Sequence, residues 1–187
     1  MQRIRPFMNT DLIKVFTGIR RAGKSVMLEL VKNELKESGI SEENFLCINF
    51  EQFSNSQFLD VESLYKKIVD FQKNTKGKIY LFFDEIQEVD GWEKCINSCR
   101  IDFDCDIYIT GSNAKLLSGE LATYLAGRYV EFVIYPFSFA EFFEMNLIKN
   151  PNVDKATCFM QFLKTGGMPF LSNFPDDDSA KSRYLID

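Results

Sequence analysis

The feature of this sequence that most constrains its fold is the run G-I-R-R-A-G-K-S at residues 18–25. It matches the phosphate-binding loop G-x-x-x-x-G-K-[ST] at every fixed position. Gly18 and Gly23 permit backbone angles that a Cβ would forbid, so that successive N–H groups can turn toward an anion. Lys24 places an ammonium against the β and γ phosphates of a nucleotide, and the hydroxyl of Ser25 is a hard oxygen ligand suited to Mg²⁺. The run therefore predicts a nucleotide site.

The residues on either side of the run support this prediction. An apolar, β-prone stretch at 12–17 precedes it, and apolar residues at helical spacing follow it. The helix adds the positive end of its dipole to the phosphate site. Arg20 and Arg21 of this run are candidates to contact phosphate or a bound partner. We expect one of the two to be only solvated. The expected nucleotide-binding residues are Gly18, Ile19, Arg20, Arg21, Ala22, Gly23, Lys24, Ser25 and Val26.

Composition narrows the class of protein. The chain has 187 residues, enough for one substantial core and a small appendage, and its net charge of −5 argues against a generic nucleic-acid coat. No apolar stretch is long enough to cross a bilayer and no secretion signal is evident, so we expect a cytoplasmic location. Histidine is absent, which excludes Ser-His and Cys-His catalysis and His-containing zinc sites. The five cysteines form no C-x-x-C pair and are expected to be small buried thiols.

Strands and helices alternate along most of the chain. Besides the first pair, apolar runs predict strands at 44–50, 79–83, 106–110 and 129–135, and helical spacing predicts helices near 64–71, 92–100 and 113–127. This alternation implies an α/β fold with a parallel sheet and right-handed crossovers. We therefore expect a core domain at 1–137.

From about residue 138 the pattern changes to a helical segment, 138–187, that looks cut short. Two aromatic stripes at helical spacing mark it, and we expect them to pack against the sheet domain. Their residues are Phe139, Phe142, Phe143, Leu147, Phe159, Phe162 and Leu163.

Two acids follow the apolar run at 79–83 directly. Asp84 is expected to hold Mg²⁺ through water, and Glu85 to polarise the water that attacks the γ-phosphate. The alternative is that both acids only cap the helix that follows the strand. Adjacent acids after a buried strand favour hydrolysis over phosphoryl transfer to a metabolite.

Four further residues are candidates for the same chemistry. Ser112 and Asn113 follow the fourth predicted strand and would sense the γ-phosphate by a hydrogen bond; the alternative is an N-cap for the next helix. Asn49 ends the second strand and is expected to hold Glu85 in an inactive orientation. The alternative is that Asn49 has no functional role. Arg128 precedes the fifth strand and faces away from its own nucleotide, so that it would act on a neighbouring subunit as an arginine finger. Its alternative is a surface arginine favoured by a helix C-terminus.

Four blocks of the sequence together resemble the AAA+ superfamily of P-loop ATPases and, within it, a prokaryotic group of predicted ATPases. They are G-I-R-R-A-G-K-S, F-F-D-E-I-Q, I-T-G-S-N-A-K-L-L-S and L-A-G-R-Y-V-E-F-V-I-Y-P-F-S-F-A-E-F. The resemblance runs from about residue 4 to the end. It implies a three-layer P-loop NTPase sandwich with sheet order 5-1-4-3-2, followed by the start of a helical lid. It also assigns Walker A to Lys24 and Ser25, Walker B to Asp84 and Glu85, the sensor to Asn113 and the finger to Arg128.

The resemblance is incomplete in the last third of the chain. Full-length members of the group usually carry a C-terminal domain similar to the restriction-endonuclease core, which these residues lack. No arginine matches the second sensor convincingly, and Lys164, Lys181 and Arg183 are only candidates. G-G-M-P at 166–169 looks like the lid motif of signal-transducing and origin-recognition relatives, many of which act as switches.

The predicted function is therefore Mg²⁺-dependent ATP hydrolysis by an AAA+ ATPase domain, completed between subunits through Arg128 and coupled to a conformational change in the missing domain. The alternative is a nucleotide-gated interaction module that binds ATP and hardly hydrolyses it. DNA engagement is a third option, suggested only by what the missing domain resembles. The expected ligands are ATP and Mg²⁺, and a protein or DNA partner is left open.

Overall fold

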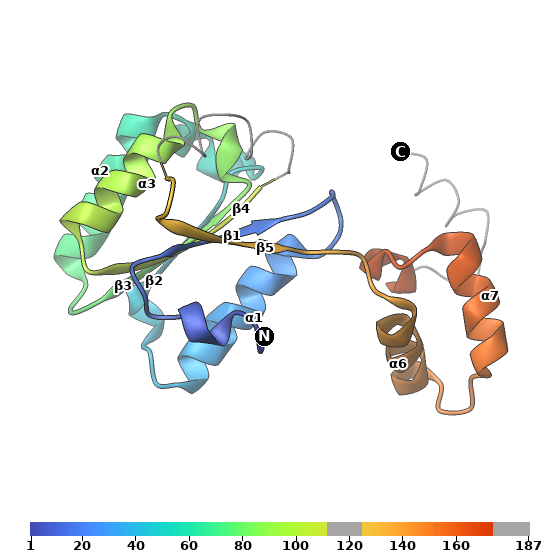
Figure 1. The fold of residues 1–187 in the computed structure, drawn as a ribbon. Helices are drawn as coiled ribbons and strands as arrows, with labels where there is room; N and C mark the ends of the chain where they lie inside the picture. The colour runs from blue at the N-terminus through green and yellow to red at the C-terminus, as the bar shows by residue number, and fades with distance from the viewer. Residues whose placement is uncertain (112–124, 174–187) are drawn as a thin grey trace. The chain divides into compact units, whose positions relative to one another are not determined.

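The structure of this chain is a computed structural model that describes residues 1–111 and 125–173. The chain divides into two compact units (Figure 1). The larger contains Met1–Gly18 and Lys24–Val133, and the smaller contains Ile19–Gly23 and the chain from Ile134 onward.

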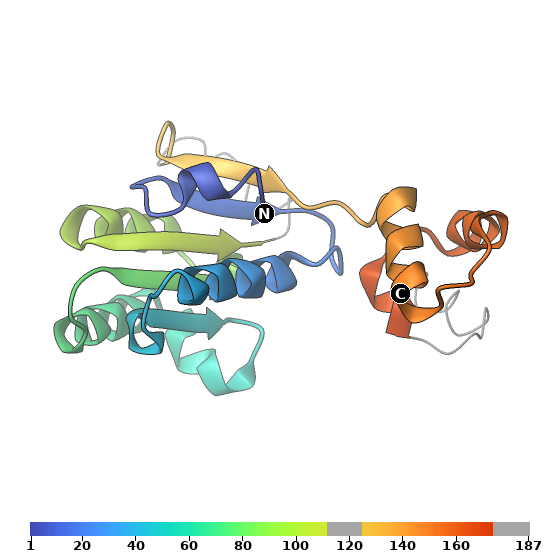
Figure 2. The ribbon, with the colours of Figure 1, turned by 90° about the horizontal axis from the view of Figure 1, so that it is seen from below.

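The larger unit is built on a five-stranded parallel sheet with the order β2-β3-β4-β1-β5, which Figure 2 shows face on. This is the predicted order 5-1-4-3-2 counted from the other edge, so the expected P-loop NTPase fold is confirmed. The three central strands are buried along their whole length, which explains why they are mostly apolar, and β3 has an uninterrupted apolar run at 79–83. The strands are β1 (Ile13–Thr17), β2 (Phe45–Asn49), β3 (Ile79–Asp84), β4 (Cys105–Thr110) and β5 (Tyr129–Val133).

Helices cover both faces of the sheet. α1 (Lys24–Glu37) lies on one face, and α2 (Val61–Asn74) and α3 (Trp92–Asp102) lie on the other (Figures 1 and 2). α2 begins three residues earlier than predicted because the Asp60 carboxylate caps it, accepting a hydrogen bond from the Ser63 backbone N–H at 2.9 Å. Short 3₁₀ helices complete the unit at Arg5–Phe7, Glu42–Asn44, Phe53–Leu59 and Ile86–Glu88.

Most of the helix predicted at 113–127 lies outside the described residues. Its last three residues, 125–127, form a bend and turn before β5 rather than helix. Gly127 has φ 72°, a left-handed conformation that suits glycine and ends regular helix.

The main hydrophobic core lies between the sheet and the pair α2–α3. Apolar side chains at helical spacing on these two helices are fully or almost fully buried against β3 and β4, which gives each helix one apolar face. They are Leu64, Ile68, Trp92, Ile96 and Cys99. On the opposite face of the sheet, α1 buries Leu28, Val31 and Leu35.

A charged network is buried at the amino-terminal edge of the sheet. Lys14 in β1 and Asp106 in β4 are both fully buried and form an ion pair. The Lys14 ammonium also donates to two backbone carbonyls of the preceding loop at 2.7 and 3.0 Å. Asp106 accepts from the Asn9 backbone N–H at 2.8 Å and from the Tyr108 hydroxyl at 2.7 Å. Burial lowers the pKa of Lys14, and the charge of Asp106 opposes this shift.

The described residues of the smaller unit form the α-helices α6 (Phe139–Lys149) and α7 (Lys155–Thr165), followed by a 3₁₀ helix at Pro169–Asn173. A capping box formed by Ser138 and Glu141 begins α6. The Phe139 ring lies 5.0 Å from the Phe159 ring and 5.6 Å from the Phe162 ring, measured between centroids. The two predicted aromatic stripes therefore pack against each other.

Within the smaller unit, the backbone of the G-G-M-P run (166–169) lies very close to the backbone of Phe137. The Phe137 N–H donates to the Gly167 carbonyl at 2.7 Å. A Cβ added to Gly167 would lie 1.9 Å from the Phe137 carbonyl oxygen, so only glycine fits at this position.

Candidate nucleotide site

The carboxyl ends of the parallel strands meet at one edge of the sheet, and four of them end in a polar residue. These are Asn49 of β2, Asp84 of β3, Thr110 of β4 and Thr17 of β1, in the order of the strands. The register pairs Asn49 with Asp84 and Phe16 with Thr110, which keeps the strand ends level. In open parallel sheets, ligands bind beyond this edge.

The glycine-rich loop leaves the sheet at the same edge. β1 ends at Thr17 and α1 begins at Lys24, so the loop joins a strand directly to a helix N-terminus. Gly18 has φ 143° and Gly23 has φ 105°, angles that L side chains rarely adopt. Arg21 also has a positive φ, 68°. The sequence predicted that glycine is needed at Gly18 and Gly23, and both residues adopt positive φ angles in the structure.

Lys24 is buried although it is charged. Only 5% of the residue is exposed, and its ammonium lies 3.3 Å from Oε1 of Glu85 and 3.4 Å from the Gly18 carbonyl oxygen. A buried ammonium needs such partners, because burying an isolated charge is costly. The lysine is therefore held at the mouth of the loop, with an acid as its counter-charge.

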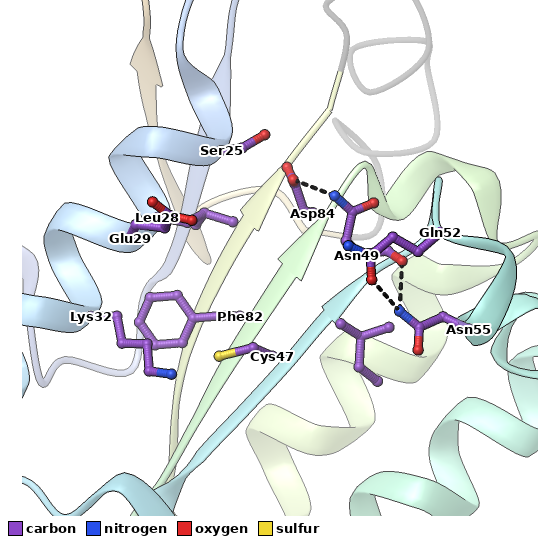
Figure 3. A pocket seen from close by; sticks show the side chains of 11 residues that line it. Ser25, Leu28, Glu29, Lys32, Cys47, Asn49, Gln52, Asn55, Phe82 and Asp84 are labelled. Atoms are coloured by element: carbon purple, nitrogen blue, oxygen red, sulfur yellow. Dashed lines mark hydrogen bonds between the residues drawn. The ribbon is translucent and has the colours of Figure 1, made fainter.

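Ser25 and Asp84 line one cavity of about 310 Å³, and Figure 3 shows the serine hydroxyl on the side of the Asp84 carboxylate. Asp84 is 7% exposed, and each of its oxygens accepts a hydrogen bond: Oδ1 from the Thr110 hydroxyl, and Oδ2 from the Asn49 amide at 3.0 Å. These bonds fix the carboxylate, which still has lone pairs left for a further ligand.

Glu85 sits in a restrained position directly after β3. Its backbone is left-handed, with φ 55° and ψ 50°, an uncommon conformation for a residue with a side chain. Its N–H donates to the Thr110 hydroxyl at 2.9 Å, and its Oε2 accepts from the Gln87 amide at 2.6 Å. With Lys24 on Oε1, the carboxylate has a partner on each oxygen.

The side-chain amide that donates to Glu85 is thus that of Gln87. The prediction that Asn49 holds Glu85 is wrong in this structure. Asn49 uses its side chain on Asp84 and on the Glu51 backbone N–H, because its strand register places it beside Asp84. Sequence reasoning also passed over Thr110, which joins the two acids. The signals for both missed residues were present: a polar residue at a strand end, and the Gln in D-E-I-Q.

The donor set suits a nucleotide with magnesium. Ser25 and Asp84 provide hard oxygen ligands on one cavity wall, and Lys24 provides a buried cation whose described partners are acceptors. Within residues 1–111 and 125–173, no three His, Cys, Asp or Glu side chains gather closely enough to hold a metal ion by themselves. Mg²⁺ keeps several waters and takes substrate phosphates as ligands, so one carboxylate and one hydroxyl meet its needs.

Comparison with known proteins fits this geometry. A model of the AAA domain family matches residues 10–143, more than half of the chain. The chain belongs to the AAA domain family. It is 45% identical to an uncharacterized protein of Haemophilus influenzae, an alignment that covers 90% of this chain and 42% of that protein. It is 37% identical to an uncharacterized protein of Methanocaldococcus jannaschii, covering 92% of this chain and 39% of that protein. The chain thus spans about two fifths of the length of these relatives.

Solved structures share the fold of this AAA domain at low sequence identity. The replication initiator DnaA, bound to AMPPCP and single-stranded DNA, matches with a TM-score of 0.61 and 16% identity over 99% of this chain and 62% of that one. PCH-2 of C. elegans matches with a TM-score of 0.60 and 12% identity over 96% of this chain and 63% of that one. These likenesses show an AAA+ P-loop fold. Family membership and fold together support nucleotide binding.

Several other predicted residues of the AAA domain lie outside the described part of the chain. Ser112 and Asn113 fall in the segment 112–124, which is not described, as do Lys181 and Arg183 in 174–187. Lys164 is an exposed residue of α7. None of the helices in the described parts of the chain is long and apolar enough to cross a membrane.

Arg128 lies at the opposite edge of the sheet from the loop. Its carbonyl accepts from the N–H of Ile13 at the start of β1, and its exposed guanidinium donates to Asn97 at 3.2 Å. Lys24 follows the far end of β1, and a five-residue strand spans roughly 17 Å. The arginine therefore does not reach the site of its own chain, which is a condition for the role predicted on a neighbour.

The cavity that Ser25 and Asp84 line is also lined by a cysteine and a second lysine. Cys47 and Lys32 line it, and the Cys47 side chain is exposed, whereas the sequence suggested buried thiols. The difference arises because β2 is an edge strand with one side open to the cavity. Partial desolvation nevertheless raises the pKa of the Cys47 thiol, and the charge of Lys32 opposes this shift.

Proposed function

We propose that this AAA domain binds ATP with Mg²⁺ and hydrolyses it. The observation that carries the proposal is the convergence of Lys24, Asp84 and Glu85 at the carboxyl edge of the sheet, next to a glycine-rich loop that opens a helix. A buried cation, a fixed carboxylate and a second carboxylate one residue further on are the groups that phosphoryl transfer to water requires.

Each residue has a defined task in this proposal. The backbone amides of residues 19–25 and the Lys24 ammonium bind the β and γ phosphates. Ser25 would hold Mg²⁺ directly and Asp84 through water, and the ion would neutralise charge on the phosphate oxygens. Glu85 orients a water and accepts its proton as the water oxygen bonds to the γ phosphorus and the bond from that phosphorus to ADP breaks. Asn113 or Ser112 senses the γ-phosphate, and Arg128 acts on the site of a neighbouring copy.

We further propose that hydrolysis in a core at 1–137 is coupled through the helical segment 138–187 to the rest of the full-length protein. The curated relatives are more than twice as long as the matched region, which supports a further region as the receiver of this change. We also propose that the protein is cytoplasmic, and that the further region binds a protein or DNA partner.

The alternative function is a nucleotide-gated switch with little turnover. The engagement of both Glu85 oxygens, by Lys24 and by Gln87, favours it, because these partners hold the carboxylate in place and compete with a water for its lone pairs. The two functions differ in the rate of phosphate release and not in ATP binding.

The test is steady-state phosphate release with ATP and Mg²⁺ across protein concentration, for the parent chain, Glu85→Gln and Arg128→Ala, with ATP affinity measured by calorimetry. We expect all three proteins to bind ATP, and specific activity to rise with parent concentration and to fall in both variants. Tight binding with negligible turnover at every concentration would identify the switch. Equal turnover in Glu85→Gln and the parent would remove Glu85 from the mechanism.

A further inference from the structure

Gln87 makes a contact that the proposed function does not use. It lies two residues after Glu85 in the 3₁₀ helix Ile86–Glu88, and its Nε2 donates to Oε2 of Glu85 at 2.6 Å. This is shorter than most N–H···O bonds, as expected when the acceptor is a carboxylate. The contact joins Gln87 to the residue that acts as base in the proposed hydrolysis.

The rest of Glu85 is held by other groups, which leaves Oε2 to Gln87. The left-handed backbone of Glu85 is fixed through its N–H by the Thr110 hydroxyl, and Lys24 lies on Oε1. Phosphate binding would draw Lys24 toward the phosphates and release Oε1. In the described part of the chain, the bond from Gln87 is the side-chain contact of Glu85 that a nucleotide does not compete for.

The other end of the Gln87 amide supports a positioning role. Its Oε1 is buried and meets no donor among the described residues. Exchanging the amide oxygen and nitrogen would put Oε1 against the Glu85 carboxylate, so the orientation of the amide is set by Glu85. Folded proteins rarely leave a buried acceptor without a donor, and the exceptions call for an explanation. Here the explanation is that the donor end of the amide is required by Glu85.

We propose that Gln87 is the positioning residue of Glu85. This inference rests on the proposed function. Gln87 holds Oε2 and keeps the carboxylate facing Lys24, so that Oε1 is the oxygen that Lys24 gives up and that receives the proton of the attacking water. In the nucleotide-free protein the same contact keeps Glu85 in competition with phosphate for Lys24.

The first test is independent of turnover and uses side-chain amide NMR signals of the nucleotide-free chain. The Gln87 signal is assigned by its loss in Gln87→Met. We expect it to show one downfield, exchange-protected proton, and to lose both properties in Glu85→Ala. An amide that exchanges freely in the parent, or that is unchanged in Glu85→Ala, would overturn the contact.

The second test separates positioning from general damage by measuring kcat and ATP affinity in Gln87→Met. We expect kcat to fall about 10-fold, the loss typical for a hydrogen bond to a charged group. We also expect ATP to bind about 2- to 5-fold tighter, because a loosened carboxylate competes less for Lys24. In a Glu85→Ala background, Gln87→Met is expected to leave ATP affinity unchanged. The matched control is Gln57→Met, at an exposed glutamine of the segment Phe53–Leu59, which we expect to resemble the parent.

The outcomes distinguish the two proposals. An unchanged kcat, or a lower kcat together with weaker ATP binding, would overturn the role of Gln87 while leaving hydrolysis intact. If the parent binds ATP without turning it over, hydrolysis fails, and the affinity shift and its absence in Glu85→Ala still decide whether Gln87 positions Glu85.

Discussion

Two lysines near the ends of β1 pair with carboxylates, and the two pairs differ in every respect that matters for function. At the amino-terminal edge, Lys14 and Asp106 are fully buried, and their remaining hydrogen-bonding capacity is taken by backbone and by Tyr108. At the carboxyl edge, Lys24 lies 3.3 Å from Glu85, whose side chain is 14% exposed and adjoins the glycine-rich loop. The first pair is closed to ligands, and the second is open to them.

The difference shows how one sheet combines stability with reactivity. A buried ion pair holds its place only when further hydrogen bonds satisfy both partners, as at Lys14. Lys24 has a loose contact with its counter-ion and a long one with the Gly18 carbonyl, so a phosphate can replace Glu85 as its partner. We therefore expect the first lysine to control stability and the second to control ligand binding.

The largest effect is expected from Lys14→Met. Removing one partner leaves the buried Asp106 charge uncompensated, so the free energy of unfolding should fall by about 3–5 kcal/mol, measured by urea denaturation. The ATP affinity of the folded fraction should change by less than about 3-fold, because Lys14 lies at the far edge of the sheet. A loss of stability under about 1 kcal/mol would contradict the comparison.

The double variant Lys14→Met, Asp106→Leu sharpens the same test. It removes both charges, and apolar replacements of a buried ion pair are often neutral or stabilising. We expect it to recover at least about 2 kcal/mol relative to Lys14→Met. No recovery would mean that the packing of the lysine stem, and not the unpaired charge, explains the loss.

Lys24→Met should show the reverse pattern. We expect ATP affinity to fall at least about 100-fold, since the phosphates lose their buried cation, a change of about 2.7 kcal/mol. The free energy of unfolding should change by less than about 1 kcal/mol, because Glu85 is partly exposed and can turn toward water. Calorimetry and urea denaturation of the same sample measure both quantities. Strong destabilisation with intact ATP binding would reverse the roles of the two lysines.

The smallest effect is expected in the pH dependence of the closed network. Burial, and then the charge of Asp106, raise the pKa of Tyr108. Below about pH 10 the tyrosine is protonated in both states, and its contribution to stability is complete. Above pH 10 only the unfolded state ionises, so stability falls by up to about 1.4 kcal/mol per pH unit.

Tyr108→Phe removes this slope, which urea denaturation between pH 9 and 11 would measure. The lowered pKa of Lys14 acts in the opposite direction, because the unfolded state then holds the extra proton and stability rises with pH. Lys14 is present in both proteins, so its effect cancels in the comparison. Parallel pH profiles for the parent and Tyr108→Phe would show that Tyr108 ionises as freely in the folded protein as in the unfolded one.

The strands were predictable to within one or two residues because each is a short, mainly apolar run, and four of them end in a polar residue. The residues 79–83 are the plainest case: a strand buried on both faces has no polar face to obscure it. Helix starts were less predictable. α2 begins at Val61 because of a hydrogen bond made by Asp60, and a capping bond of this kind leaves little trace in the hydrophobic pattern.

For the site, the sequence alone determined the chemistry: a glycine-rich loop whose spacing permits only a few backbone paths, a lysine, a serine and two acids after a strand. Such local motifs carry their own geometry, because glycine angles and strand ends are properties of neighbouring residues. The tertiary structure alone decided the partners. Asn49 donates to Asp84, and Gln87 donates to Glu85, because strand register and a left-handed turn set which side chains meet. The tertiary structure also decided which lysine–carboxylate pair is accessible to a ligand and which is not, since burial depends on segments far apart in the chain.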